Sequence, residues 1–532
     1  MLGTLLVVVI FATYFPLLQF PLVQDDWGIA HVFKFQPTLS TLTHLFYPVG
    51  RIFYRPLAFV YCAAELHLFG LSPLGFHLPA LILLIGTSFL VVSVGKRLSG
   101  DDVVGWGAGF LYASVATVHI DIQMWLVGIF DIGATLFALL SIYFFLRARI
   151  FASAVAMALG LGFKEAAVTV PVVLVAFWIF IPHQEAAPSR SLRSVWKDFR
   201  FHAVILLAYL AIKIQGASLF ALPVDHPYAA RIFGSDLWHR ILLYAGWIVE
   251  SVTPLKNVFL FRPIPLLVPA VFSILAAIAY ISVARRKMTE KSFDAQRFRR
   301  GAFITSWLLL TLIPPFALIN HPNKYYLGIA LPALAIAMVT VLTGIGRAFS
   351  GSNRLLISLT AIFVALNVAD GATLVWRKAH LGIKEGIHAS SLEGDNHLIR
   401  KASLVRLVQD QLFLYYPVLP RGAALVLENV DIIVLAGEMG PQVWYGDSTL
   451  QVSNATPTIS VDGGSAQIFL PPKDYWNPAE PMRIVTRPLD EIFCVQRVGD
   501  SLEVVSRDDL RRRLLDSGSR PDSTWTPGEL AD

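Results

Sequence analysis

The sequence predicts a polytopic α-helical membrane protein with a small C-terminal α/β domain. Of its 532 residues, 55% are hydrophobic and 15% are charged, whereas soluble globular proteins have roughly 25% charged residues. Apolar runs of about 20 residues, the length that crosses a bilayer as a helix, recur up to residue 375. Beyond that point short apolar segments alternate with turn residues. We expect a membrane module over 1–375, an extracytoplasmic α/β domain over 376–516 and a disordered tail over 517–532.

The first apolar run has no basic leader and no small-residue cleavage site, so we expect a retained signal-anchor helix. It begins a series of about eleven expected membrane spans. These are 2–19, 75–96, 103–119, 126–146, 150–163, 166–182, 203–221, 264–284, 302–319, 325–345 and 354–375.

Basic residues fall on alternate loops between these runs, which predicts cytoplasmic loops near Lys96 and Arg193. The other loops and the C-terminus then face outward, in a bacterial-type inner membrane or its equivalent. Apolar segments 52–70 and 236–260 are expected at the outer membrane surface, because counting them as crossings would invert every later loop. The net charge of +6 follows from this topology and does not indicate a nucleic-acid partner.

The first outer loop begins with the motif Q-D-D-W at residues 24–27, directly after the first apolar run. Two adjacent carboxylates at the rim of a helix bundle can have a pKa raised towards a value useful for a general base. The alternative interpretation is that Asp25 and Asp26 only cap and solvate the loop. The pair alone does not decide between the two.

Further motifs follow in order. They are R-P-L at 55–57, L-F-G-L-S-P-L-G-F-H-L at 68–78, H-I-D-I-Q-M-W at 119–125, D-I-G-A-T-L-F at 131–137 and F-K-E-A-A-V-T-V-P at 163–171. Together they resemble the lipid-linked glycosyltransferases of the GT-C fold, especially protein O-mannosyltransferases and aminoarabinose transferases. The resemblance covers residues 10–375.

This resemblance implies transfer of a sugar, hexosyl or pentosyl, from a polyprenyl-phosphate carrier to an acceptor hydroxyl on the outer side. Asp25 matches the catalytic base and Asp26 its neighbour, although Asp-Asp replaces the common Asp-Glu and leaves open which of them acts. Lys164 matches a lysine near the carrier phosphate. The turn H-P-N-K-Y-Y at 321–326 looks like the family's E-R-Y-x-Y turn, with Lys324 in place of arginine.

Transfer chemistry itself requires a proton acceptor and cations that stabilise the departing phosphate. The candidate phosphate ligands are Lys164, Lys324, Arg55 and His321. Cations at helix ends can also simply reach towards the membrane surface, and Lys164 with Glu165 can form a structural ion pair.

Supporting candidates are His119, Asp121, Asp131 and Glu165. Asp131 lies inside an expected span, where an acid is a functional candidate by default. His119 is better explained by a helix-end hydrogen bond than by a metal. The spacing requires no metal or other cofactor and leaves open whether a divalent ion takes part.

The expected partners are a polyprenyl-phosphate sugar, a protein, lipid or glycan acceptor, and membrane lipid, without nucleic acid. A second hypothesis is a transporter, flippase or polymerase of cell-envelope glycans. Transporters place charges and helix breaks near the bilayer midplane, whereas the ionisable residues here collect at the outer rim. The C-terminal domain shows no nucleophile and base pairing and is expected to orient an acceptor or partner.

Overall fold

The computed structural model describes residues 1–47, 53–181, 192–216, 221–224, 226, 228–234, 236–253, 295–350, 353–384, 397–454, 458–459, 464–470, 483–499 and 501–516. The chain forms two compact units. Unit 1 contains Met1–Leu18, Leu42–Gly70 and Leu74–Arg377, and unit 2 contains Gln19–Thr41, Leu71–Pro73 and Lys378–Asp532. The expected span 264–284 and the expected disordered tail 517–532 lie outside the described residues.

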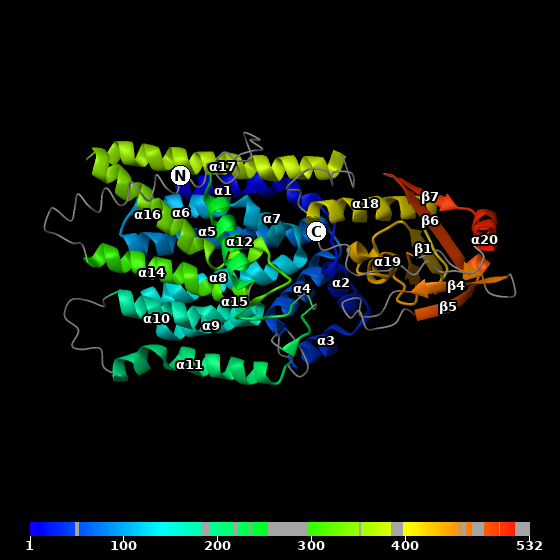
Figure 1. Ribbon diagram of the computed structural model, residues 1–532, viewed down its shortest axis with the longest axis horizontal. Coiled ribbons are helices and arrows are strands. Elements are labelled where there is room, and N and C mark those ends of the chain that lie inside the picture. Colours follow the sequence, from blue (N-terminus) through cyan, green and yellow to red (C-terminus); the bar gives the residue numbers. More distant parts are fainter. Residues whose placement is uncertain are drawn as a thin grey trace. The chain divides into compact units, whose positions relative to one another are not determined.

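Unit 1 is a helical bundle, in which α8 packs on α9 and α10 packs on α14 (Figure 1). Its elements are α1 (Leu2–Tyr14), η1 (Phe15–Gln19), α4 (Pro56–Phe69), α5 (Pro73–Ser99), α6 (Asp102–Ser114), α7 (Ala116–Met124), η2 (Leu126–Gly128), α8 (Ile129–Leu146), α9 (Ile150–Phe163), η3 (Glu165–Thr169), α10 (Val170–Phe180), α11 (Leu192–Ile214), α12 (Leu237–Val252), α14 (Ala295–Thr311), α15 (Ile313–Ala317), η5 (Lys324–Leu327), α16 (Leu331–Ser350) and α17 (Asn353–Lys384).

Large apolar side chains cover the outside of this bundle. Phe151 and Leu207 are each 66% exposed, and Ile82 is 57% exposed. An exposed surface of this kind suits lipid and not water. Within the described residues, five stretches are long and apolar enough to cross a bilayer, namely Leu2–Gln19, Pro73–Ser99, Leu126–Leu146, Phe298–Ala317 and Ile357–His380. The expected multi-pass helical membrane protein is confirmed, whereas the described residues do not establish the expected number of spans.

The expected span 103–119 is broken in the structure. Helix α6 ends at Ser114, and the pair α6 and α7 is bent by 56°. The break leaves carbonyl groups of the last α6 turn without helical partners, and three side chains donate to them. Ser114 Oγ donates to Leu111 O at 2.8 Å, Tyr14 OH to Ala113 O at 2.9 Å, and His119 Nε2 lies 2.9 Å from Tyr112 O. Hydropathy alone does not reveal this break, because the residues on both sides of it are mostly apolar.

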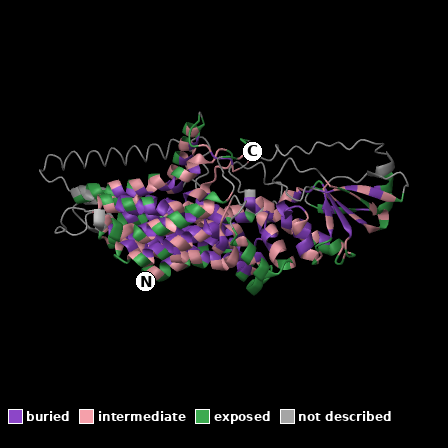
Figure 2. Ribbon diagram, turned by 90° about the horizontal axis from the view of Figure 1, so that it is seen from below, coloured by how far each residue is buried: buried purple, intermediate pink, exposed green. Residues whose placement is uncertain are grey.

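Unit 2 contains a mixed four-stranded sheet with strand order β2-β1-β6-β7. Strand β1 pairs in parallel with β2 and β6, while β7 pairs antiparallel to β6. All five β1 residues are buried, and Figure 2 shows much of this sheet in purple. A three-stranded antiparallel sheet has the order β3-β4-β5. The expected small α/β region is therefore present.

The bounds of its elements are α18 (His397–Tyr415), β1 (Ala424–Glu428), η7 (Ile432–Leu435), α19 (Met439–Tyr445), β2 (Gln451–Ser453), β3 (Thr458–Ile459), β4 (Ser465–Leu470), β5 (Arg483–Pro488), η8 (Leu489–Glu491), β6 (Ile492–Val498), β7 (Ser501–Val505) and α20 (Arg507–Asp516). Helix α3 (Thr38–Leu45) contains residues of both units, as do the ends of η1, α5 and α17.

Unit 2 also includes the segment that follows η1, with helix α2 (Asp25–Phe35). The Trp27 ring meets the edge of Trp444 in α19 with ring centroids 5.4 Å apart. The backbone N–H of Gln24 donates to Val434 O at 2.9 Å. The sequence analysis assigned this segment to the membrane module, which was expected to end at residue 375. The structure differs because hydropathy cannot show which distant residues a segment packs against.

Candidate functional site

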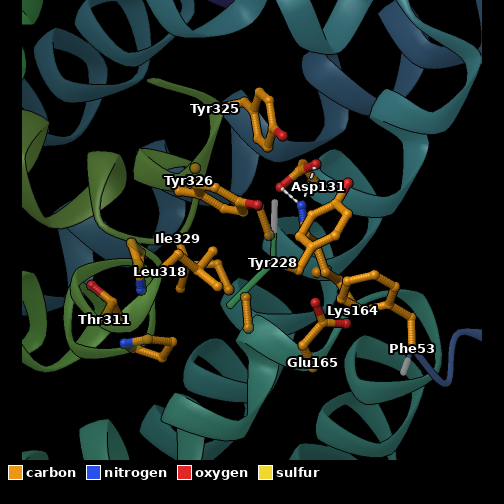
Figure 3. Close-up of a pocket in the computed structure, with 16 residues that line it drawn as sticks. Phe53, Asp131, Lys164, Glu165, Tyr228, Thr311, Leu318, Tyr325, Tyr326 and Ile329 are labelled. Atoms are coloured by element: carbon orange, nitrogen blue, oxygen red, sulfur yellow. Dashed lines mark hydrogen bonds and ion pairs between the residues drawn. The ribbon is translucent and has the colours of Figure 1, made fainter. Parts of the chain in front are cut away.

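A cavity of about 80 Å³ lies in unit 1, and charged and tyrosine side chains line part of it (Figure 3). They come from chain segments that are far apart in the sequence. The polar lining includes Asp131, Lys164, Glu165, Tyr228, Tyr325 and Tyr326.

Lys164 forms a close ion pair with Asp131. Asp131 lies in the first turn of α8, and Lys164 follows the last residue of α9, so the antiparallel packing of these helices brings the two together. Lys164 Nζ lies 2.6 Å from Asp131 Oδ1 and 2.7 Å from Oδ2. The rings of Tyr325 and Tyr326 lie 4.9 and 4.8 Å from the same ammonium. Both carboxylate oxygens and two aromatic faces thus stabilise its charge.

A second ion pair joins Arg55 and Glu165. Arg55 immediately precedes α4, and Glu165 begins η3. The Arg55 guanidinium makes two parallel contacts with the Glu165 carboxylate, Nε to Oε2 at 2.9 Å and Nη2 to Oε1 at 2.5 Å. The same group lies 4.3 Å from the centre of the Phe53 ring. A two-point contact of this kind fixes the orientation of the guanidinium as well as its position.

One interpretation of the sequence was that the adjacent residues Lys164 and Glu165 form an ion pair with each other. In the structure each of them pairs with a different residue. The backbone at Lys164 is extended, with φ −157° and ψ 143°, and side chains of neighbouring residues in an extended segment point in different directions. Lys164 reaches α8 and Glu165 reaches the start of α4. The result is two separate charge pairs near the same cavity.

The turn at 321–326 supplies aromatic rings to the cavity. His321 Nε2 lies 2.8 Å from Tyr325 OH, and the His321 and Tyr228 ring centroids are 4.8 Å apart. Lys324, a candidate ligand of the carrier phosphate, has its Nζ 2.9 Å from Glu250 Oε1 of α12. In the described part of the chain it does not line this cavity, because Glu250 provides a carboxylate for it elsewhere.

His119 and Asp121 lie on α7, apart from the residues that line the cavity. His119 is fully buried and serves the helix end described above, whereas Asp121 is half-buried. Among the described residues, no group of three or more His, Cys, Asp or Glu side chains is arranged to hold a metal ion.

Asp25 and Asp26 open α2 in unit 2, and the structure distinguishes between them. Asp26 is 0% exposed, and its Oδ2 accepts a hydrogen bond from Val23 N at 3.2 Å. Asp25 is half-buried. Burial lowers the pKa of Lys401 in α18, while the charges of Asp431 and Asp25 oppose that shift. Asp25 is therefore the more accessible carboxylate and lies within electrostatic reach of an ammonium group.

Sequence reasoning missed two contributors to these sites. Tyr228 is a single tyrosine in a loop, and Glu250 is the partner of Lys324. Neither belongs to a motif, so no local signal could have identified them. Tyr325 and Tyr326 were noticed only as members of the turn, because their contact with Lys164 joins segments about 160 residues apart.

Comparison with known proteins agrees with the resemblance seen in the motifs. No family model matches the chain. The human protein O-mannosyl-transferase TMTC2 is 28% identical over 182 residues, which are 31% of this chain and 22% of that protein. The chain is similar to a mannosyltransferase. The matched part of this chain spans less than a quarter of the length of the human protein.

A similar solved structure is that of ArnT from Cupriavidus metallidurans bound to undecaprenyl phosphate. The TM-score is 0.41 with 14% sequence identity, and the alignment covers 84% of this chain and 85% of that one.

Proposed function

We propose that this protein is a membrane glycosyltransferase of the GT-C type. In this proposal it moves a sugar from a polyprenyl-phosphate carrier to an acceptor hydroxyl on the extracytoplasmic side. The observation that carries the proposal is the cavity of unit 1, where Lys164 is held by Asp131 and flanked by two tyrosine rings. The similarity to a human O-mannosyl-transferase supports the reaction class.

The two cations suit the binding of a phosphate. An ammonium has three N–H donors and a guanidinium has five, and the contacts to Asp131 and Glu165 use two of each. Both groups therefore retain donors for a ligand while their positions are held by the fold. Preorganised donors stabilise developing negative charge without further reorganisation. Our proposed ligands of the carrier phosphate are Lys164, which lines the cavity, and Arg55, which is bound to the lining residue Glu165, with His321 and Lys324 as supporting candidates.

The reaction forms a bond between the acceptor oxygen and the anomeric carbon of the sugar, and it breaks the bond from that carbon to the phosphate oxygen. The acceptor hydroxyl gives its proton to a carboxylate, and the phosphate leaves with the bonding electron pair. We assign the proton acceptor to Asp25, because Asp26 is completely buried and Asp131 already accepts from Lys164. Asp26 then acts by holding the start of α2.

The positions of the charged residues favour an enzyme over a transporter. Asp131 is the third residue of α8, Lys164 follows the end of α9, and Arg55 precedes α4. The charges thus lie at helix ends, whereas transporter sites lie near the bilayer midplane at interrupted helices.

Replacing Asp25 with Asn tests the proposed base. The change keeps the side-chain shape but removes the proton acceptor, and a general base contributes about 10²–10⁴ in rate. We expect turnover of a radiolabelled polyprenyl-phosphate sugar to fall at least about a hundredfold, with little change in carrier affinity. Asp26→Asn should cause a smaller loss. Asp102→Asn is the matched control, since Asp102 also lies in the first turn of a helix and its side chain is 81% exposed.

Turnover within about threefold of wild type for both variants would place the base elsewhere, and Asp131 or Asp121 would become the next candidate. A greater loss for Asp26→Asn would exchange the two roles. Wild-type protein that moves a lipid-linked glycan across the bilayer without transferring sugar would support the transporter hypothesis.

A further inference from the structure

We propose that Arg240 is a positioning residue that holds together two loop segments and so fixes the tyrosine wall of the unit 1 cavity. This inference rests on the proposed function, because it assigns Arg240 an effect on carrier binding. The two segments are 228–231, which precedes α12, and 316–321, which contains the last two residues of α15 and the turn that follows.

The two segments pair directly with each other. Arg231 N donates to Ala317 O at 2.7 Å, and Ile319 N donates to Ala229 O at 3.1 Å. Ala230 and Leu318 form an antiparallel bridge between these hydrogen bonds. A pairing of this length supplies few hydrogen bonds, and isolated two-stranded pairings are marginally stable at best. The position of the loops must therefore depend on further contacts.

Arg240 supplies such a contact from the first turn of α12. Its side chain is buried, with the residue 3% exposed. Nε donates to Phe316 O at 2.7 Å, and Nη2 donates to Arg231 O at 3.3 Å. One guanidinium thus bridges one carbonyl from each segment. Among the described residues its hydrogen bonds go to main-chain carbonyls and not to a carboxylate.

The paired segments carry part of the cavity wall. Leu318 and Tyr228 line the cavity, and the Tyr228 ring contacts the ring of His321. His321 in turn lies 2.8 Å from Tyr325 OH, and the Tyr325 ring faces the Lys164 ammonium at 4.9 Å. A continuous set of contacts therefore runs from the segments held by Arg240 to the proposed phosphate ligand.

Arginine is specifically suited to this position. Its planar guanidinium presents donors at fixed angles, so two carbonyls on different segments can be bound at once. Lysine keeps the charge but concentrates its donors on a single atom at the end of a flexible chain. Arg240→Lys should therefore preserve charge and much of the packing while losing the bridge.

The test compares Arg240→Lys and Arg240→Met with His239→Gln, a change at the exposed neighbouring residue. The probe is undecaprenyl phosphate added to the full-length protein in detergent, together with the transfer assay. Since a displacement of about 1 Å can cost up to about a hundredfold, we expect Arg240→Lys to weaken binding at least about tenfold. The carrier KM should rise while the acceptor KM stays within about twofold. His239→Gln should match wild type.

Hydrogen exchange at the Arg231 and Ile319 amides provides an independent measurement. We expect both amides to exchange faster in Arg240→Lys, and an unchanged exchange rate would overturn the proposal. Binding within about twofold of wild type in a folded Arg240→Lys protein would also overturn it. If neither Arg240 variant folds, Arg240→Gln takes their place, because its amide can donate to only one of the two carbonyls at Phe316 and Arg231. Arg240→Gln should speed exchange at the two amides, and unchanged exchange would overturn the proposal.

Failure of the proposed function has a different signature. Wild-type protein that binds no undecaprenyl phosphate would contradict the proposed function, and the amide exchange rates would still decide whether Arg240 holds the two segments together.

Discussion

At the scale of single residues, the pairing of charges matters more than their number. Lys164 and Asp131 are nearly enclosed, with side-chain exposures of 6% and 12%. A buried ion pair is costly to break from one side, because the remaining charge loses its partner without regaining water. The pair therefore couples the stability of the bundle to the chemistry proposed for the cavity.

Asp131→Asn should destabilise the protein by about 3–5 kcal/mol, since it leaves the Lys164 ammonium uncompensated. The double change Asp131→Leu with Lys164→Met should cost less than Asp131→Asn alone, while removing the proposed phosphate ligand and with it transfer activity. Thermal and denaturant unfolding in detergent measures these differences. The control is Asp102→Asn, which breaks an exposed pair with Lys96 and should cost less than about 1 kcal/mol. Equal losses at both sites would show that the Lys164 pair is not buried from solvent.

At the scale of secondary-structure elements, the placement of Asp25 depends on how α2 packs within unit 2. Trp27 is buried against Trp444 of α19, and Lys34 Nζ donates to Val443 O at 2.5 Å near the other end of α2. These contacts hold a helix of 11 residues, a length that is marginal for an isolated helix in water. The C-terminal part of the chain thus stabilises the helix that carries the proposed base.

Trp444→Ala should therefore reduce transfer activity although Trp444 is distant in sequence from both acids. Removing a buried Trp costs about 3–5 kcal/mol, and the half-buried Trp444 should cost somewhat less. We expect faster limited proteolysis between residues 36 and 47 and a turnover loss larger than the loss in carrier binding. Trp196→Ala, at a 63% exposed tryptophan, is the matched control. Unchanged proteolysis and turnover in Trp444→Ala would show that α2 does not need this contact.

At the scale of the whole molecule, the sidedness of the membrane topology is the central expectation. Cytoplasmic loops carry an excess of Lys and Arg, and the loop around Arg193 is basic. A reporter fused near Arg193 should be active only in the cytoplasm, and one fused after Lys384 only on the extracytoplasmic side. Enzymatic reporters that work on a single side of the membrane measure this directly. Activity of either reporter on the opposite side would remove the basis for an extracytoplasmic reaction.

Several helices could be predicted from the sequence to within a few residues. The expected spans 75–96 and 150–163 correspond to α5 at Pro73–Ser99 and α9 at Ile150–Phe163. Such predictions succeed because the transfer of a helix into lipid depends on its own composition and on satisfying its own backbone hydrogen bonds. The individual candidates Lys164, Asp131 and Arg55 were also identified in this way, because charges next to apolar runs are conspicuous.

Only the tertiary structure decided which residues act together. It paired Lys164 with Asp131 and Glu165 with Arg55, moved Lys324 to Glu250, and placed α2 in the C-terminal unit. At the bend after α6, Tyr14 from the distant helix α1 donates to the Ala113 carbonyl. The sequence by itself determined the membrane class and the candidate charges, because these follow from local composition. The pairings depend on the relative positions of distant segments, and one-dimensional hydropathy contains no information about those positions.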